Sequence, residues 1–313
     1  MKAIIIRNYG DASQFEEAEV PVPLLKSQDV LVEVHAASVN AVDWKIRSGY
    51  MKAILTYKFP LILGLDIAGI VTKVGDGVTR FKVGDAVLAK SNLTDNGGYA
   101  EFIAIDEQLL VLKPSNISFG EAAALPLAGV TAWQALTHFA KLKAGERILI
   151  QGGAGSVGSL AIQFAKALGA TVIATASTNN IELLQSLGVD QAIAYDKEDF
   201  VEALKDPVDV VFDMIGGDVL ARSYSLLVKG GRLVSISEAP NPELEAKYGI
   251  KASFFVTLEG GNYLEEIVKL AEEGKVRPVI RTSFSLTADG LESAHRLIED
   301  GHTYGKVIIK VKG

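Results

Sequence analysis

The chain of 313 residues contains no cysteine. This absence excludes disulfide bonds and thiolate metal centres. Histidine could still bind a metal, but the short spacing that places two histidines on one helix face is missing as well. None of the four histidines, His35, His138, His295 and His302, shows that spacing. We therefore expect a protein without a metal cofactor.

Long apolar runs and an excess of positive charge are also missing. Although 49% of the residues are hydrophobic, no uninterrupted apolar stretch approaches the roughly 18 residues of a membrane span. A net charge of −7 disfavours nucleic acid or an anionic membrane as the main partner. Because the chain begins directly with a strand-like segment, Lys2–Arg7, without a signal-peptide pattern, we expect a soluble, cytoplasmic protein.

Glycine, by contrast, is abundant, and one cluster of it stands between two regular patterns. The β-forming run Arg147–Ile150 leads into residues 153–158 (GAGSVG), and an amphipathic helix follows as far as Gly169. A strand, a tight glycine turn and a helix are the context that the dinucleotide-binding fingerprint requires. The pattern therefore predicts a nucleotide cofactor, with a purely structural turn as the alternative.

The residues of this turn have distinct expected roles. Gly153 permits the turn, Gly155 lets the backbone approach a pyrophosphate, and Gly158 lets the helix and the strand pack closely. The helix N-terminus adds N–H groups and partial positive charge. We expect the cofactor phosphates to contact Gly153, Ala154, Gly155, Ser156, Val157 and Gly158.

The pattern of predicted elements changes twice along the chain. Before Lys113, short strands such as Asp29–Ala37 and Ile67–Val74 alternate with glycine turns, which is typical of an antiparallel barrel. A capping-box pattern at Ser118 and Glu121 then opens a region of alternating strands and helices, which predicts a parallel, doubly wound sheet. After Gly274 the first pattern returns. We expect a nucleotide-binding domain, 118–274, inserted in a domain made of residues 1–117 and 275–313.

Several segments spread over the whole chain carry family-specific motifs. They are residues 40–49 (NAVDWKIRSG), 64–69 (GLDIAG), 81–87 (FKVGDAV), 98–102 (GYAEF), 122–136, 151–166 and 305–307 (GKV). Together they resemble the zinc-independent medium-chain dehydrogenase/reductases of the quinone oxidoreductase (zeta-crystallin-like) type. The chain departs from that pattern at Ala41, where the family more often has proline, and at Ser156, where glycine is usual.

The resemblance implies an α/β fold in which a Rossmann sheet is inserted in a GroES-like, mainly antiparallel β-barrel domain. It implies a homodimer that reduces quinones or α,β-unsaturated carbonyl compounds with NADPH. Zinc-dependent relatives carry His-Glu after the glycine that corresponds to Gly64, whereas Leu65-Asp66 stands here. Two other functions remain open, a non-catalytic NADPH-binding protein and an enoyl-thioester reductase.

The second strand of the predicted sheet bears on the choice of nucleotide. An NAD-binding fold places Asp or Glu about 20 residues beyond the glycines, but no acid occurs between Gly158 and Glu182. This absence favours NADPH. No Lys or Arg occurs nearby either, so a 2′-phosphate would rely on hydroxyl and amide donors; a plain helix cap is the alternative. The expected contacts are Ser177, Thr178 and Asn179, with Tyr195 added because it matches a family tyrosine.

Three residues of one short segment are candidates for the chemistry. The resemblance places Asn40 and Asp43 near the nicotinamide end of the cofactor, although both could equally cap the loop. Lys45 is the stronger candidate, because an ammonium in a partly dry site could polarise a carbonyl oxygen or protonate an enolate. A solvated helix lysine is the alternative for Lys45. We expect Arg47 to be an ion-pair residue that anchors the loop.

The remaining cofactor contacts come from strand ends and from the resemblance. Ile215 and Gly216 follow a strand that ends at Asp213, and Ser237 ends the next strand, on the edge of a parallel sheet where ligands bind. The family motif around Thr131 implies contact with the nicotinamide ribose or amide. Lys306 is either a cofactor contact or a surface lysine.

Overall fold

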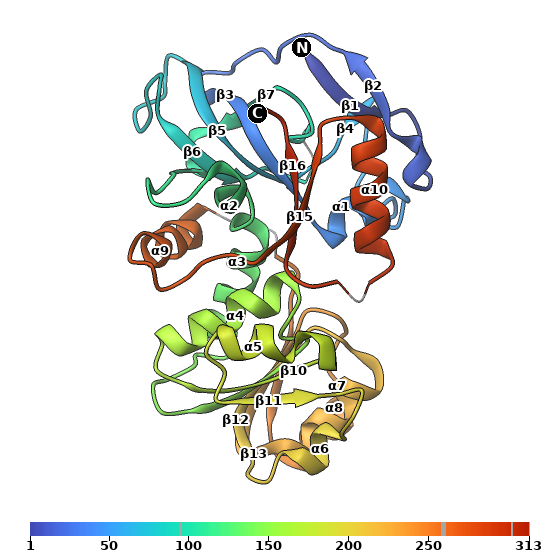
Figure 1. The fold of residues 1–313 in the computed structure, drawn as a ribbon, viewed down its shortest axis with the longest axis vertical. Helices are drawn as coiled ribbons and strands as arrows, with labels where there is room; N and C mark the ends of the chain where they lie inside the picture. Colours follow the sequence, from blue (N-terminus) through green and yellow to red (C-terminus); the bar gives the residue numbers. More distant parts are fainter. Residues whose placement is uncertain (94–95, 258–260, 302, 313) are drawn as a thin grey trace. The chain divides into compact units, whose positions relative to one another are not determined.

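The computed structural model describes residues 1–93, 96–257, 261–301 and 303–312 (Figure 1). Its contacts divide the chain into two compact units. The first unit consists of residues 1–128 and 258–313, and the second of residues 129–257. Within the described residues, no helix is long and apolar enough to cross a membrane.

The second unit is built on one parallel sheet of six strands. Its strand order is β11-β10-β9-β12-β13-β14, so the chain moves outward from β9 first in one direction and then in the other. This order is that of a doubly wound nucleotide-binding sheet, with its switch point beside β9. The strands are β9 (Arg147–Gln151), β10 (Thr171–Ala176), β11 (Gln191–Ala194), β12 (Val208–Asp213), β13 (Leu227–Ser235) and β14 (Lys251–Phe254).

Helices cover this sheet on both sides, with α4 and α5 on one and α6, α7 and α8 on the other (Figure 1). Side chains alternate along each strand, so Leu149, Val211 and Leu233 share one face, where they join a core with Phe200 and Leu220. The helices are α4 (Ser156–Ala167), α5 (Ile181–Ser186), α6 (Phe200–Ala203), α7 (Gly217–Ser223) and α8 (Pro242–Tyr248), with short turns at Thr178–Asn180 and Tyr224–Leu226.

The described residues of the first unit form two sheets, which are antiparallel except for the pair β15 and β16. The larger has the order β15-β16-β3-β5-β6-β8, and the smaller has the order β2-β1-β4. The long strand β3 pairs with β7 near its start and with β16 near its end, which curves the sheet into a barrel-like form. The strands are β1 (Lys2–Ile6), β2 (Glu16–Glu19), β3 (Asp29–Val39), β4 (Leu61–Ile62), β5 (Asp66–Val74), β6 (Ala86–Lys90), β7 (Phe102–Asp106), β8 (Leu110–Leu112), β15 (Ile280–Ser285) and β16 (Lys306–Lys310).

Helices fill the ends of this unit. The helix α10 packs against β15, β16 and the short helix α1, which directly follows β3. The helices are α1 (Ala41–Arg47), α2 (Phe119–Ala123), α9 (Gly261–Glu272) and α10 (Ala288–Glu299), with short turns at Ala12–Gln14 and Glu107–Leu109. The helix α3 (Pro126–Gln134) crosses the division between the units and continues as a π-helical turn, Ala135–Phe139.

The predicted fold class is confirmed, and so is the capping box, in which Ser118 and Glu121 each accept the other's backbone N–H. The unit boundaries differ from the expected 118–274. The helix α2 packs on β3, β5 and β16, and α9 packs on β6 and β8. Because Asn116 Nδ2 also donates to Ala271 O over 2.9 Å, both helices belong to the first unit. The change of pattern at Ser118 marks a change of secondary structure, not of core.

Candidate functional site

The glycine turn after β9 is held by a pair of buried polar side chains. Thr175, on β10, donates from Oγ1 to Gln151 Oε1 over 2.8 Å and accepts from the backbone N–H of Gly152 over 3.1 Å. Gly152 has φ of +84°, a left-handed conformation that favours glycine. The expected role of Gly153 is therefore wrong in one respect: Gly152 makes the turn. A Cβ on Gly153 would lie 2.8 Å from Ala174 Cβ, so Gly153 is needed for close packing on β10.

The other two glycines have the expected environments. A Cβ on Gly158 would lie 2.3 Å from Gly152 O, so glycine is required where α4 meets the turn. A Cβ on Gly155 would meet only Gly152 O at 3.5 Å, which leaves space beside the backbone at the start of α4. Ser156 and Val157 begin the helix, at the positive end of its dipole. A backbone cradle of this kind fits the pyrophosphate of a dinucleotide.

The end of β10 contains an acid that the local sequence does not show. Thr178 donates to Asp196 Oδ1 from its backbone N–H over 2.8 Å and from Oγ1 over 3.0 Å. Desolvation raises the pKa of Asp196, but these hydrogen bonds and Lys197 outweigh it, so the pKa lies below its usual value and the group is ionised. Asp196 comes from the turn after β11, the neighbouring strand. The absence of an acid within residues 159–181 therefore does not mean that none is nearby.

The other expected donors around this strand end are accessible. Thr178 and Asn179 are exposed, Tyr195 is 51% exposed, and Ser177 is half-buried with its Oγ accepting from Asn180 Nδ2 over 3.1 Å. The Tyr195 backbone N–H donates to Ala176 O over 3.1 Å, so Tyr195 lies beside the end of β10.

A buried carboxylate organises the ends of β12 and β13. Asp213 accepts from Ser235 Oγ over 2.9 Å and from the backbone N–H of Gly216 over 3.1 Å, and burial raises its pKa. Gly216 has φ of +82°, and Ile215 beside it is exposed. Ser237 is also exposed. Because β9, β10, β12 and β13 are parallel neighbours, their ends bring the glycine turn and these residues to one sheet edge.

Thr131 belongs to a different part of the second unit. It lies on α3, is buried, and shares a hydrogen bond of 2.9 Å between its Oγ1 and Thr257 Oγ1. This contact ties α3 to the chain segment that follows β14.

The first unit contains a buried cluster of charged and polar groups. Lys306 is 1% exposed, and its Nζ donates to Asn40 Oδ1 over 2.6 Å and to Asp66 Oδ2 over 3.1 Å. Asn40 Nδ2 donates to the same Asp66 oxygen over 2.9 Å, while Asp66 Oδ1 accepts from the Leu127 N–H over 2.9 Å. The alternative of a surface lysine at position 306 is therefore wrong. The side chain of Asn40 is bonded at both ends within this cluster.

Asp43 continues the buried network toward α10. Its Oδ2 accepts from the Asn40 backbone N–H over 2.8 Å, at the start of α1, and from Tyr99 OH over 3.4 Å. The Tyr99 hydroxyl also lies 3.3 Å from Nε2 of His295, on α10. Burial, helped by the charge of Asp66, raises the pKa of Asp43 to about 7. Burial also lowers the pKa of His295 well below its usual value, so His295 is neutral.

Comparisons with known proteins agree with this arrangement. Residues 26–115 match the alcohol dehydrogenase GroES-like domain, and residues 187–309 match the zinc-binding dehydrogenase model. The chain is 41% identical over 318 residues to the 2-methylene-furan-3-one reductase of Solanum lycopersicum, covering 99% of this chain and 79% of that protein. It is 39% identical to the chloroplastic NADPH-dependent alkenal/one oxidoreductase of Arabidopsis thaliana, with the same shares covered.

Solved structures with a similar fold include members of the same class of oxidoreductases. The quinone oxidoreductase from Coxiella burnetii is 36% identical, with a TM-score of 0.88, and the match covers 100% of this chain and 99% of that one. The CurK enoyl reductase is 28% identical, with a TM-score of 0.89 and 99% of both chains covered. The chain belongs to the medium-chain dehydrogenase/reductases of the quinone oxidoreductase type. It is an oxidoreductase with a nicotinamide-binding domain.

Some members of this family bind zinc, but the residues present here do not fit such a site. Leu65, which follows Gly64, is buried and apolar, and the chain contains no cysteine. Asn40 and Asp66 are already bonded to the Lys306 ammonium. Across the described part of the chain, no three His, Asp or Glu side chains gather as a ligand set. His302 lies outside the described residues.

The two basic residues of α1, Arg47 and Lys45, differ in their burial. Arg47 is completely buried, and its Nη2 donates to Glu299 Oε1 over 2.7 Å, so its expected role as an anchoring ion-pair residue is confirmed. Lys45 is exposed, with its Nζ 5.9 Å from the centre of the Trp44 ring. An exposed ammonium on a helix that is fixed at both ends is available to bind a substrate oxygen.

Proposed function

We propose that this protein reduces quinones or α,β-unsaturated carbonyl compounds with NADPH, without a metal. The observation that carries the proposal is the glycine turn, which leaves open space beside Gly155 at the carboxyl edge of a parallel sheet. The names of relatives that match nearly the whole chain support the substrate class, because they include an alkenal/one oxidoreductase and a quinone oxidoreductase.

The edge of the second unit would hold the nucleotide. Residues 153–158 contact the pyrophosphate, and Ser177, Thr178, Asn179 and Tyr195 contact the adenosine end. Thr131, Ile215, Gly216 and Ser237 contact the nicotinamide half. NADPH supplies the hydride when it is bound, so the chain itself must orient the reactants and stabilise charge on the substrate oxygen.

Within the first unit, Lys45 would contact the substrate. Its exposed ammonium donates a hydrogen bond to the carbonyl oxygen, where negative charge develops as the substrate is reduced. Asn40 and Asp43 would act by positioning. The Asn40 amide is bonded to Asp66 and Lys306, and Asp43 Oδ2 accepts from the Asn40 backbone N–H and from Tyr99 OH, which fixes the start of α1. Lys306 supports Asn40 in this role.

The preference for NADPH over NADH tests the proposed contacts at the adenosine end of the cofactor. The hydroxyl and amide donors of residues 177–179 favour a 2′-phosphate, and we expect NADPH to bind at least tenfold more tightly than NADH, about 1.4 kcal/mol. Asp196→Asn should enlarge this ratio by removing a nearby negative charge, whereas Ser177→Asp should reduce it. Glu202→Gln, at an exposed acid of α6, is the matched control. Equal dissociation constants for NADPH and NADH in fluorescence titrations of the unaltered protein would contradict the proposal.

Independence from metal is a separate test. Because Leu65 and the absence of cysteine leave no zinc ligand set, NADPH-dependent reduction should survive exhaustive dialysis against a chelator. Elemental analysis should detect no stoichiometric zinc. A reproducible zinc equivalent per chain would overturn this part of the proposal.

The proposed homodimer rests on the edge of the second unit's sheet. β14 ends the strand order, and Phe254 and Val256 at its end are 41% and 56% exposed. Pairing of two such edges would cover these apolar side chains. Analytical ultracentrifugation should find a dimer, and Phe254→Lys should shift it toward monomer.

An enoyl-thioester reductase is the second candidate, favoured by the similarity to the CurK enoyl reductase. One assay separates the candidates: NADPH oxidation with a small quinone, an enone and an enoyl-CoA. We expect the quinone or the enone to be the best acceptor. Turnover of the thioester alone would favour the second candidate, and binding of NADPH without turnover of any acceptor would indicate a non-catalytic protein.

A further inference from the structure

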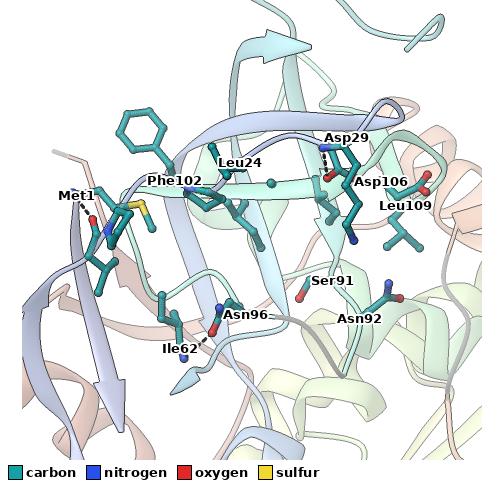
Figure 2. A pocket seen from close by; sticks show the side chains of 18 of the residues that line it. Met1, Leu24, Asp29, Ile62, Ser91, Asn92, Asn96, Phe102, Asp106 and Leu109 are labelled. Atoms are coloured by element: carbon teal, nitrogen blue, oxygen red, sulfur yellow. Dashed lines mark hydrogen bonds between the residues drawn. The ribbon is translucent and has the colours of Figure 1, made fainter. Parts of the chain in front are cut away.

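A cavity of about 720 Å³ lies within the first unit (Figure 2). Its walls come from the start of β1, the extended segment before β3, the outer side of β7 and the chain that follows β6. Asn40, Asp43 and Lys45 do not line it. The volume falls in the range of about 300–1,000 Å³ that is usual for small-molecule sites.

One wall of the cavity is mainly apolar. Along β7 the side chains alternate, so Phe102, Ala104 and Asp106 share the half-exposed face while Ile103 and Ile105 point to the core. Leu24 and Leu109 line the cavity as well (Figure 2). Leu24 lines the cavity although it is 93% exposed, so an apolar side chain is available there to cover a ligand.

The opposite wall contains a buried hydroxyl group, that of Ser91. Ser91 directly follows β6, is 2% exposed, and lines the cavity (Figure 2). Its backbone N–H donates to Leu65 O over 2.7 Å, which fixes the position of the side chain. Among the residues that the structure describes, however, its Oγ has no hydrogen-bond partner. Buried hydroxyls are nearly always hydrogen-bonded, so an orphaned one that faces a cavity indicates a missing partner.

The acids of the cavity are already engaged. Asp29 Oδ2 accepts from the Lys26 backbone N–H over 2.9 Å, and Asp106 Oδ1 accepts from the Gln108 backbone N–H over 2.9 Å. These carboxylates would repel an anion, and their hydrogen bonds leave them poorly placed to bind a cation. Lys26 and the N-terminal Met1 also line the cavity, and the Met1 ammonium is paired with Glu19 over 3.2 Å. Because groups of both signs are present, the cavity is best suited to an uncharged molecule.

We propose that this cavity is a second binding site, for a small uncharged and largely apolar molecule with one hydroxyl or carbonyl group that hydrogen-bonds to Ser91 Oγ. The apolar body of the ligand would pack on Phe102, Ala104 and Leu24. The site is independent of nucleotide binding and of the proposed reduction, since it shares no residue with either.

Two matched probes test the proposal: 2-naphthol, which has one hydroxyl, and naphthalene, which has none. By fluorescence titration, 2-naphthol should bind at least tenfold more tightly than naphthalene. Ser91→Ala should abolish that difference, and Ala104→Trp, which fills the cavity from the outer face of β7, should weaken both probes at least tenfold. Ser186→Ala, at an exposed serine of α5, should change neither affinity.

A crystal soaked with 2-naphthol locates the site directly, and density should lie between Ser91 and Ala104. NADPH-dependent quinone reduction should be unchanged in both cavity variants, so failure of this proposal is distinguishable from failure of the proposed function. Equal affinity of the unaltered protein and Ser91→Ala for 2-naphthol would overturn the proposal. Density for a water alone on Ser91 Oγ would overturn it too.

Discussion

Both units contain buried polar networks, but they differ in the polar groups that stay exposed beside them. In the first unit, Asp66, Lys306 and Asn40 are buried and form hydrogen bonds with one another, so these groups have their partners inside the protein. In the second unit, the strand ends carry glycine and exposed hydroxyl or amide side chains, and Gly155 faces open space. The first arrangement fixes a helix, whereas the second leaves a surface ready for a ligand.

This difference explains which side chains can meet a substrate. Buried partners are expensive to separate, because each charge would be left in a medium of low polarity. Asn40 and Asp43 therefore serve best as fixed supports for α1. Lys45 lies on the same helix but is exposed, so it combines a fixed backbone with a free side chain.

The largest expected effect comes from breaking the buried cluster. Lys306→Met would leave the Asp66 carboxylate without its buried ammonium partner, and loss of one member of such a pair costs about 3–5 kcal/mol of unfolding free energy. Urea denaturation measures this loss. Lys310→Met, at an exposed lysine of the same strand, is the matched control and should change stability by less than about 0.5 kcal/mol. Equal stability of the two variants would show that the cluster contributes little.

The next largest effect is expected at the exposed lysine of α1, Lys45. Lys45→Met should lower turnover by about 10²-fold, because a positioned donor to the developing oxyanion is lost. NADPH affinity should stay nearly intact, and enones should suffer more than quinones, whose reduced oxygen is stabilised by the ring. Lys52→Met, at another exposed lysine, should be silent in steady-state assays. Reduction of enones at the normal rate by Lys45→Met would mean that this lysine is only a solvated helix residue.

A smaller effect, on the pH dependence of stability, is expected from the buried carboxyl group of Asp43. Burial raises the pKa of Asp43 from 3.8 to about 7, so the folded protein holds this proton more tightly than the unfolded chain. The stabilisation is fully present below the unfolded pKa and is lost as pH rises through about 7. Asp43→Asn cannot ionise and avoids this loss.

Relative to the unaltered protein, Asp43→Asn should therefore gain roughly 2 kcal/mol of unfolding free energy between about pH 5 and pH 8. Urea midpoints at the two pH values measure the change. Asp76→Asn, at an exposed acid, should show no such gain. A difference between Asp43→Asn and the unaltered protein that is the same at both pH values would refute the raised pKa.

Local patterns predicted most of the elements well. The strands expected at Asp29–Ala37 and Ile67–Val74 agree with β3 and β5 to within two residues at each end, and the helix α4 follows the glycine turn as expected. The glycine fingerprint correctly predicted the strand, the turn and the helix at this sheet edge, because the three are consecutive in the chain. It misassigned the turn itself, since a positive φ at Gly152 rather than Gly153 depends on how the turn packs against β10.

Three functional features had no local signal. Asp196 reaches Thr178 only because β11 lies beside β10, and Asp213 organises its loop through Ser235 on the next strand. From the sequence, Lys306 could be either a surface residue or a cofactor contact. Its burial follows from the pairing of β16 with β3, which brings it to Asn40 and Asp66.

The sequence by itself determined the fold class, the presence of a glycine turn between a strand and a helix, and the lack of cysteine ligands, because periodicity, glycine spacing and composition act over short stretches of chain. Only the tertiary structure decided which charges are buried together and which side chains remain exposed. Lys306 and Asp66, for example, are separated by 240 residues and meet through strand pairing. Such contacts depend on the whole packed core, whose long-range geometry no local pattern encodes.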